Sequence, residues 1–471
     1  METTTTIEVL KAAIGNPVTR TALKGLSKYC EKDEKNRIEI AIDLFTGVRE
    51  SACFSCKTAE KIIGRTLIKG GAAFGLNQND LKDKFREPGW SRGLSSVIRG
   101  IAQFGVTKPF TSGAPFQLVW DVTTACNLRC KHCYSNSGKK QKNELTTEQA
   151  KKAIDIFDRA GVTILAFSGG EPLVRPDIFT LTKYAHKKGL YVALATNGTL
   201  ITSAKSQEMK DAGIQFVQIS LDGANAETHD AFRGIQGAFN KTLEGIKNSV
   251  AKNFFVEIST TVTRYNYTEV PAIIDLSEKL GANWFMAFNF VPTGRGKDVI
   301  ETDLTPQQRE EMLKMLWHEL KTRQHINVLS TAPQFARVAL EKEATEKKKI
   351  IPTHFYNPIL SGKLMDLAEF LGGCGAGRLY MAMRPNGDLE PCVFFPLKIG
   401  NVLKDDFEDL WMHNPVLNNL RNKDILTDGC GTCEFRYYCG GCRARAYGYL
   451  DNYLSPDPGC IRNQKAYKDL I

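Results

Sequence analysis

Three cysteines stand at a spacing that could hold an iron–sulfur cluster. Cys126, Cys130 and Cys133 form a CxxxCxxC pattern directly after the apolar run Gln117–Val122. Cysteine thiolates are the ordinary ligands of [4Fe–4S] clusters. Three ligands leave one iron open, and an open position suits chemistry better than structure, as in catalytic zinc sites. A structural zinc site would want four ligands, usually in CxxC pairs, and buried thiols would need no such spacing.

A second group of cysteines lies near the C-terminus. The chain has 13 cysteines, and none lies between Cys133 and Cys374. Seven follow that gap, namely Cys374, Cys392, Cys430, Cys433, Cys439, Cys442 and Cys460. Short spacings in a reducing compartment favour metal over disulfides. We therefore expect separate metal-binding regions around a body without thiols.

The CxxxCxxC pattern, followed by Tyr134, resembles the signature of the radical S-adenosylmethionine (SAM) superfamily. The resemblance implies that the open iron chelates SAM, that one electron breaks a C–S bond, and that a 5′-deoxyadenosyl radical forms. Ser168–Pro172 is similar to the GGEP element of that family, and Ser220–Gly223 to its ISLDG stretch. The residues expected to contact SAM are Tyr134, Gly169, Gly170, Glu171, Pro172, Ser220, Asp222 and Arg233.

The C-terminal cysteines, with Gly387, resemble a SPASM domain, although two residues separate Cys439 from Cys442 where three are usual. That domain holds two auxiliary [4Fe–4S] clusters. The resemblance assigns one cluster to Cys374, Cys392 and Cys442, and the other to Cys430, Cys433, Cys439 and Cys460. Residues 375–391 contain no cysteine, so the first auxiliary cluster is expected to have an open or non-cysteine fourth site.

The elements that must position these motifs alternate between strand and helix. Strands are expected at Gln117–Val122, Val162–Phe167, Leu190–Ala195, Phe216–Leu221, Phe255–Val262 and Trp284–Phe290. Helices are expected at Thr147–Ala160, Asp177–Lys188, Ser203–Ala212, Phe239–Lys252, Glu269–Leu280 and Thr305–Thr322. Repeated βα units predict a parallel sheet covered by helices, with ligands beyond the carboxyl ends of its strands. Six units fit the partial (β/α)6 barrel of the radical SAM family.

Four regions are expected in this α/β chain of 471 residues. They are a helical, basic N-terminal domain over 1–110, the radical SAM core over 111–325, an irregular connector over 326–372, and the SPASM domain over 373–471.

The N-terminal region holds much of the excess positive charge. Residues 1–110 carry 18 basic and 12 acidic side chains, against 62 and 52 in the whole chain. Ala59–Lys69 and Trp90–Phe104 are basic and amphipathic, with Arg92 and Arg99 expected on the polar side. Such helices can lie in a membrane interface, so residues 59–104 are a candidate peripheral membrane contact. Packing against the protein itself is the favoured interpretation.

Cys30, Cys53 and Cys56 form a weaker pattern in the same region. They could hold a metal ion if a fourth ligand came from elsewhere, but buried thiols are the favoured interpretation. Met1–Thr6 lacks the basic-then-apolar pattern of a signal peptide, and no run of 18 apolar residues occurs. A cytoplasmic protein, with that candidate peripheral contact to a membrane, is therefore expected.

The resemblance implies an oxidoreductase or synthase that abstracts hydrogen from an unactivated C–H bond of a large substrate. No conventional acid–base or nucleophilic set stands out, and the catalytic residues stay unknown. A peptide or protein, a tetrapyrrole and a lipid are held near parity as substrate, with ferredoxin or flavodoxin as electron donor. Cys442–Tyr447 and Asp457–Cys460 are most similar to haem-pathway decarboxylases. The alternative class is a zinc-stabilised binding protein, without the basic aromatic repeats of nucleic-acid binders.

Overall fold

The structure is a computed structural model. It describes residues 16–73, 77–345, 348–350, 352, 359–361, 369–370, 372–468 and 470. The N-terminal stretch Met1–Thr6 and Lys347 lie outside the described residues.

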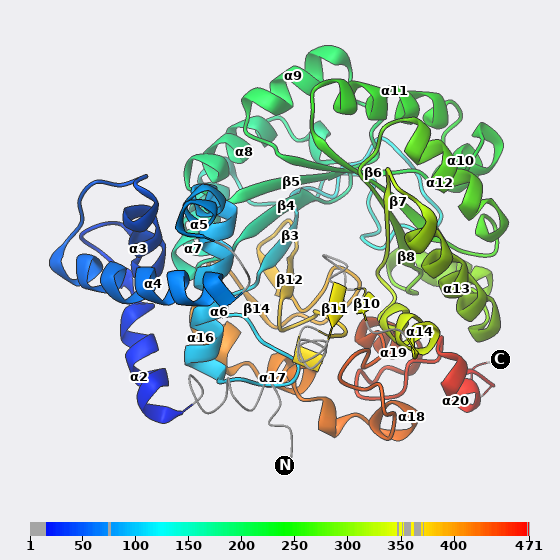
Figure 1. Ribbon diagram of the computed structural model, residues 1–471. Helices are drawn as coiled ribbons and strands as arrows, with labels where there is room; N and C mark the ends of the chain where they lie inside the picture. The colour runs from blue at the N-terminus through cyan, green and yellow to red at the C-terminus, as the bar shows by residue number, and fades with distance from the viewer. Residues whose placement is uncertain are drawn as a thin grey trace.

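The fold is organised by one curved sheet of 10 strands in the order β14-β13-β12-β3-β4-β5-β6-β7-β8-β9 (Figure 1). Its centre consists of β3 (Gln117–Asp121), β4 (Ile164–Ser168), β5 (Tyr191–Thr196), β6 (Phe216–Ser220), β7 (Phe255–Val262) and β8 (Trp284–Asn289). These strands pair in parallel in chain order. They confirm the six strands expected from the sequence and the partial (β/α)6 barrel.

Helices cover the outer face of this arc (Figure 1). They are α7 (Thr147–Ala160), α8 (Ile178–Lys187), α9 (Ser203–Asp211), α10 (Ala226–Arg233), α11 (Ala238–Ala251), α12 (Val270–Lys279) and α13 (Pro306–Thr322). The sequence predicts all of them except α10. Helix α7 begins with a capping box between Thr146 and Gln149, in which each side chain binds the other residue's backbone N–H. Gly189 ends the turn after α8 with a φ of 81°.

The region expected to be an irregular connector contains regular structure. Strand β9 (Asn327–Ser330) adds a parallel strand beside β8, and helix α14 (Gln334–Lys342) follows it. Strands β10 (Lys348–Ile350) and β11 (Ile359–Ser361) pair antiparallel with each other. The exposed edge of β8 explains the extra strand, because unpaired backbone groups at a sheet edge favour a further strand.

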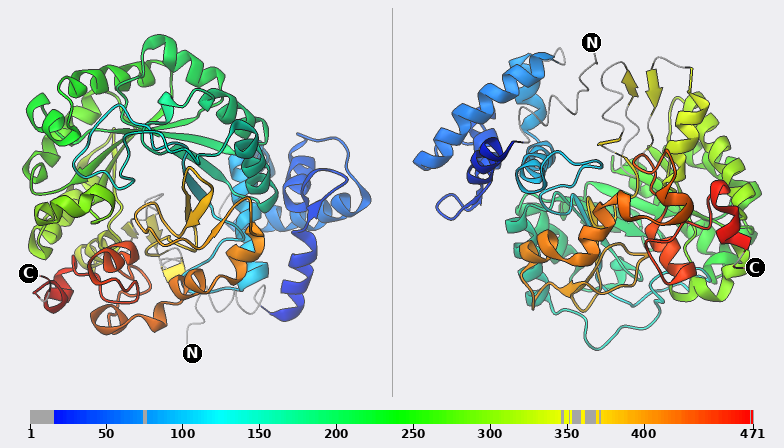
Figure 2. Two further views of the ribbon diagram at one scale, coloured as in Figure 1. Left: turned by 180° about the vertical axis from the view of Figure 1, so that it is seen from behind. Right: turned by 90° about the horizontal axis from the view of Figure 1, so that it is seen from below.

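The C-terminal segment lies across the open side of the arc (Figures 1 and 2). It contains β12 (Tyr380–Met383), β13 (Asp388–Glu390), β14 (Gly400–Asn401), α16 (Phe407–His413), α17 (Pro415–Arg421), α18 (Asp428–Gly431), α19 (Arg443–Leu450) and α20 (Gln464–Lys468). Strand β12 pairs in parallel with β3, with Tyr380 opposite Gln117. The cysteine-rich segment is therefore hydrogen-bonded into the sheet of the core.

The N-terminal region is mostly helical, as expected, and lies beside one side of the arc (Figure 2). Its elements are α2 (Pro17–Leu26), β1 (Tyr29–Cys30), β2 (Lys35–Asn36), α3 (Arg37–Thr46), α4 (Phe54–Ala73), α5 (Gln78–Phe85) and α6 (Pro88–Phe104).

Helix α6 attaches this region to the core. Arg92 and Arg99, expected on the polar side of this segment, are both buried, which agrees with the favoured interpretation that the helix packs against the protein itself. Arg92 donates to the Asp158 side chain and to the Lys188 carbonyl, and Arg99 donates to the Ala160 carbonyl. Their guanidinium groups bind the ends of core helices, so they face the protein. Among the described helices, none is long and apolar enough to cross a membrane.

Candidate active site and metal centres

A cavity of about 510 Å³ lies inside the arc. Small inward side chains on three neighbouring strands, Val119, Ala166 and Ala193, leave this space open. Most of the residues predicted to bind the first cluster and SAM line it, namely Cys126, Cys130, Cys133, Tyr134, Gly169, Gly170, Ser220 and Arg233. The structure brings together residues from the loops after β3, β4 and β6, as expected for the carboxyl ends of parallel strands.

The three sulfurs of the CxxxCxxC loop each accept a hydrogen bond. Cys126 Sγ accepts from Leu128 N at 3.4 Å, and Cys133 Sγ from Ser137 N at 3.4 Å. Arg233 Nη1 lies 3.7 Å from Cys130 Sγ. Donors aimed at sulfur favour thiolates and tune the potential of a bound cluster. This donor set therefore fits a [4Fe–4S] cluster.

Glycines let the next loop pack against the cysteine loop. Gly170 N donates to Thr123 O at 2.8 Å, and Glu171 N donates to Ala125 O at 2.9 Å. A Cβ on Gly170 would lie 2.2 Å from the Ala125 carbonyl oxygen, and Gly169 has a φ of 129°. Only glycine fits both positions without moving backbone.

Substitution of Gly170 by alanine should therefore displace the two loops that form the SAM pocket. Overpacking of this kind costs about 1–3 kcal/mol, and where the whole cost falls on SAM binding, the affinity for SAM should be roughly 5- to 150-fold lower. Equilibrium dialysis of the anaerobic protein with labelled SAM measures this effect. Gly25→Ala is the matched control, because no heavy atom lies within 4 Å of the Cβ position of Gly25. Equal SAM affinity in both variants would contradict this account of the loop.

Glu171 is fully buried and braces the loop; it does not line the cavity. Its carboxylate accepts hydrogen bonds from Thr196 Oγ1 and Asn197 N, each at 2.8 Å, and from Leu173 N at 3.1 Å. Burial raises the pKa of Glu171 to about 6, although these donors favour the charged form. Pro172 is likewise buried outside the cavity.

Asp222 and Arg233 form a buried ion pair next to the cysteine loop. Arg233 Nη2 lies 2.6 Å from Asp222 Oδ2, and Asp222 Oδ1 accepts from Thr261 N at 2.8 Å. Asp222 is fully buried and does not line the cavity, whereas Arg233 and Ser220 do. The Arg233 fork therefore joins the carboxylate to Cys130, and a carboxylate of SAM would share this guanidinium.

Tyr134 is held by the C-terminal segment. Its hydroxyl donates to Asp121 Oδ1 at 3.0 Å, and Asp121 Oδ2 lies 2.7 Å from Arg384 Nη1. The Tyr134 ring meets the edge of Phe394, with centroids 5.2 Å apart. Arg384 and Phe394 both follow β12, so this segment fixes the ring expected beside the adenine.

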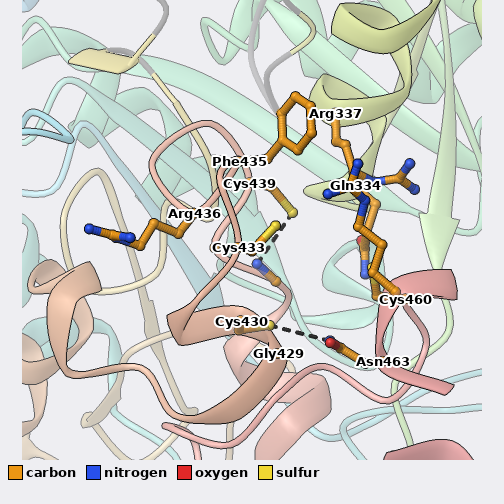
Figure 3. Close-up of a pocket in the computed structure, with 13 residues that line it drawn as sticks. Gln334, Arg337, Gly429, Cys430, Cys433, Phe435, Arg436, Cys439, Cys460 and Asn463 are labelled. Carbon is orange, nitrogen blue, oxygen red and sulfur yellow. Dashed lines mark hydrogen bonds between the residues drawn. The ribbon is translucent and has the colours of Figure 1, made fainter. Parts of the chain in front are cut away.

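The C-terminal cysteines fall into two groups. Cys374, Cys392 and Cys442 line the large cavity, on which the CxxxCxxC loop also lies. Cys430, Cys433, Cys439 and Cys460 line a second, small pocket (Figure 3). These groups are the two ligand sets that the sequence predicts. Their ligand role stays a prediction.

Hydrogen bonds to sulfur also occur in the second group. Cys430 Sγ accepts from Asn463 Nδ2 at 3.4 Å (Figure 3) and from Asp457 N, also at 3.4 Å. Cys439 Sγ accepts from Gly441 N at 3.3 Å. Four clustered sulfurs with such donors fit a fully ligated [4Fe–4S] cluster.

The sequence analysis missed Glu257, which lines the cavity from β7. It is buried, and its hydrogen-bond partner is the Gln218 amide of β6. Burial raises the pKa of Glu257 to about 7, against the opposing effect of that amide. The available signal was a single acidic residue inside the otherwise uncharged strand Phe255–Val262.

Glu257→Gln should stabilise the protein more at high pH than at low pH. The folded-state pKa is about 7, above an unfolded value of about 4.3, so stability falls as pH rises between these values. Glutamine removes the buried charge and keeps an oxygen that can accept from Gln218. The gain in unfolding free energy should grow by about 1–2 kcal/mol between pH 5.5 and 8.5.

Anaerobic denaturant titration at both pH values measures the gain. The exposed Glu244→Gln is the control and should give no such trend. The same gain at both pH values for Glu257→Gln would count against a buried carboxylate that titrates near neutrality.

Comparison with known families agrees with the site. The model of the radical SAM superfamily matches residues 120–277, and that of SPASM, an iron–sulfur cluster-binding domain, matches residues 374–434. The chain belongs to the radical SAM superfamily and carries a SPASM domain. It is therefore an enzyme that binds [4Fe–4S] clusters and SAM.

Particular relatives are similar over most of their length. The AdoMet-dependent heme synthase of Methanosarcina barkeri is 37% identical over 353 residues, which cover 74% of this chain and 97% of the relative. The mycofactocin maturase MftC of Mycobacterium tuberculosis is 34% identical over 355 residues, covering 74% of this chain and 83% of the relative. Streptococcus suis SuiB bound to S-adenosylmethionine has the same fold, with a TM-score of 0.63 at 17% identity over 91% of this chain and 96% of SuiB.

Proposed function

We propose that this radical SAM enzyme acts on a tetrapyrrole and decarboxylates its propionate side chains. The observation that carries the proposal is the 37% identity to a haem synthase across 97% of that relative. The motifs Cys442–Tyr447 and Asp457–Cys460, which resemble haem-pathway decarboxylases, point in the same direction.

When bound, the cluster and SAM would supply a 5′-deoxyadenosyl radical that abstracts a hydrogen atom. A propionate that loses this hydrogen atom, carbon dioxide and one electron becomes a vinyl group, so an electron acceptor is needed beside the substrate. Cys374, Cys392 and Cys442 line the same cavity as the CxxxCxxC loop. An auxiliary cluster on these three ligands would supply the acceptor.

The cavity wall has features that suit a flat macrocycle with carboxylates. Tyr134, Phe288, Tyr380 and Phe394 line it and offer ring faces and edges. Arg295 also lines it, and its Nη1 donates to Ser137 O at 2.7 Å, which fixes the guanidinium. Its Nε also donates to Cys130 O at 3.1 Å, so a bound carboxylate would be met by Nη2. Arg295 is therefore the group proposed to hold a propionate.

The similarity to a mycofactocin maturase keeps a peptide as the second candidate substrate. A lipid substrate, a ferredoxin or flavodoxin donor, and membrane contact through residues 59–104 stay as sequence predictions. Within that range, Ile62 and Ile68 of α4 and Trp90 of α6 are exposed, and these are the apolar groups that such a contact would use.

Anaerobic turnover tests the proposal. Reconstituted protein, SAM and a reductant would be incubated with an iron porphyrin that bears propionates, with the methyl ester of the same porphyrin, with a mixed peptide pool, or with lipid vesicles. We expect the free acid to stimulate 5′-deoxyadenosine formation and to lose carbon dioxide and two hydrogens by mass spectrometry. Equal stimulation by the ester, or stimulation only by peptide or lipid, would overturn the assignment.

A further inference from the structure

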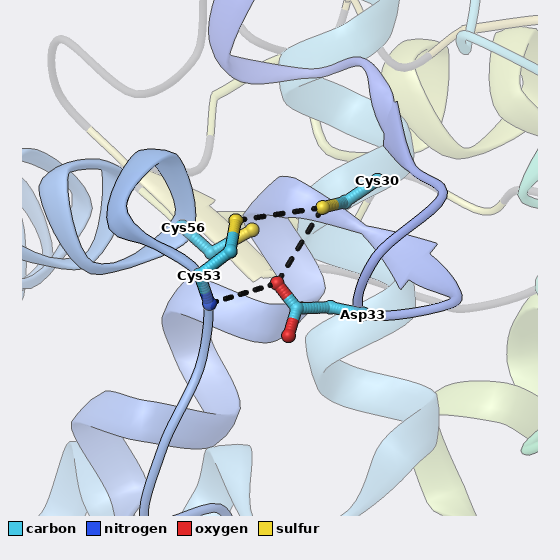
Figure 4. A group of neighbouring side chains, drawn as sticks. All are labelled: Cys30, Asp33, Cys53 and Cys56. Carbon is cyan, nitrogen blue, oxygen red and sulfur yellow. Dashed lines mark hydrogen bonds between the residues drawn. The ribbon is translucent and has the colours of Figure 1, made fainter.

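Three cysteines that the radical chemistry does not use come together in the N-terminal region. Cys30 ends β1, whereas Cys53 and Cys56 lie at the start of α4 (Figure 4). Their three sulfurs and a carboxylate oxygen of Asp33 all lie within 4.8 Å of one another. The Cys30 and Cys53 sulfurs are 3.6 Å apart.

Local structure fixes this arrangement. The β1–β2 hairpin turns through Asp33 and Glu34, and Glu34 has a φ of 51°. Asp33 Oδ2 accepts from Cys53 N at 3.1 Å and lies 3.4 Å from Cys30 Sγ (Figure 4). Asp33 Oδ1 lies 2.8 Å from Arg49 Nη2. Hairpin and helix therefore present four ligand atoms to one point.

The spacing of the ligand atoms suits a single ion. With zinc–sulfur bonds of about 2.3 Å, the sulfurs of a tetrahedral site lie roughly 3.8 Å apart. The Cys30–Cys53 separation of 3.6 Å is close to that value. A cubane cluster distributes its ligands over four irons and needs them farther apart. A disulfide would leave the third thiol and the carboxylate without a role, and its S–S bond is about 2.05 Å long.

We propose that Cys30, Asp33, Cys53 and Cys56 bind one structural zinc ion. Zinc accepts both thiolate and carboxylate ligands, and structural sites are closed and four-coordinate. Cys30 and Cys56 are buried, and Cys53 and Asp33 are partly buried, so the site is closed to solvent on most sides. Arg49 offsets part of the negative charge that three thiolates and a carboxylate bring to the ion.

The alternative of inert buried thiols fits the contacts less well. The thiols pack against Ile40, Leu44 and Ala52, but an aspartate oxygen also contacts one thiol and the backbone N–H of another cysteine, which inert thiols do not need. The apolar cluster beside them is small, and its buried members are Ile38, Ala41, Ile42, Ala59 and Ile63. Small cores commonly need a metal ion or a disulfide to be stable. The zinc ion would join the hairpin to α4.

The test is the metal content of the full-length, anaerobically purified protein. Plasma mass spectrometry should find about one zinc per chain in addition to the cluster iron. Zinc X-ray absorption on the unmodified protein should give sulfur neighbours near 2.3 Å and an oxygen near 2.0 Å. The double variant Cys53→Ser/Cys56→Ser should lose the zinc and keep the iron.

Asp33→Asn and Ser55→Ala complete the set. Asp33→Asn keeps the side-chain shape and removes the anionic ligand. A chelator should therefore extract zinc from this variant at a concentration at least about tenfold lower than the unmodified protein requires. Ser55 is exposed within the same CxxC segment, and Ser55→Ala should hold zinc like the unmodified chain. Three results would overturn the proposal. They are less than one zinc per chain in protein with its full cluster iron, zinc retained in the double variant, and a single sulfur-bound iron in place of zinc.

Discussion

Replacing Cys130 with alanine is expected to abolish reductive cleavage of SAM. Cys130 is buried in the centre of the CxxxCxxC loop, and its sulfur lies 3.7 Å from Arg233 Nη1. Loss of one of three cluster ligands should remove about four irons per chain. Substituting a residue that only hydrogen-bonds to a metal ligand already lowers activity about 10–100-fold. Removal of a ligand itself should therefore lower 5′-deoxyadenosine formation by at least about 100-fold.

Two variants make this result specific. Lys131→Ala changes an exposed neighbour in the same loop and should keep both iron and SAM cleavage. Cys433 lines the separate small pocket. The Cys433→Ala variant should therefore lose iron and still form 5′-deoxyadenosine. If Cys130→Ala kept SAM cleavage, the assignment of the first cluster to this loop would fail.

Arg445→Met is expected to lower the free energy of unfolding by about 3–5 kcal/mol, the usual effect of breaking a buried ion pair. Arg445 of α19 is fully buried, and its Nη1 donates to Phe290 O at 2.6 Å. The same guanidinium pairs with Asp303, and its Nε lies 3.2 Å from Asp457 Oδ1. Methionine would leave these two buried carboxylates without that charge.

The matched control is Arg462→Met in the same C-terminal segment. Arg462 is 40% exposed and pairs with Glu341 and Glu434. Exposed pairs contribute about 0–1 kcal/mol, so this variant should be nearly as stable as the unmodified protein. Anaerobic denaturant titration compares the two. Similar losses in both variants would mean that the buried network does not hold the C-terminal segment to the barrel.

The sequence predicted the core of the fold well because its signals are local. Two elements have the predicted bounds, the strand Phe255–Val262 and the helix Thr147–Ala160. The signals that predict them, the spacing of apolar residues and the capping box, depend only on residues close together in the sequence. Strand β12 was not predicted, because its partner β3 is remote in sequence. The prediction of an irregular connector was wrong over Asn327–Ser330 and Gln334–Lys342 for a similar reason.

The site was predictable where a motif fixes the residue type. The cysteine groups and the Gly169–Gly170 pair followed from spacing, and the structure gathers them as expected. The finer roles depended on burial. Glu171 braces a loop, and Asp33 was indistinguishable from the other acidic residues of Glu31–Glu34 until the hairpin placed it beside three thiols.

The pairing of β12 with β3 also has a consequence for how the chain folds as it leaves the ribosome. Residues 118–379 are made between Gln117 and its partner Tyr380, so one edge of the central sheet stays unpaired during most of synthesis. Contacts between distant residues slow folding, and open strand edges promote association between nascent chains. Chaperone assistance during synthesis should therefore raise the yield of intact protein.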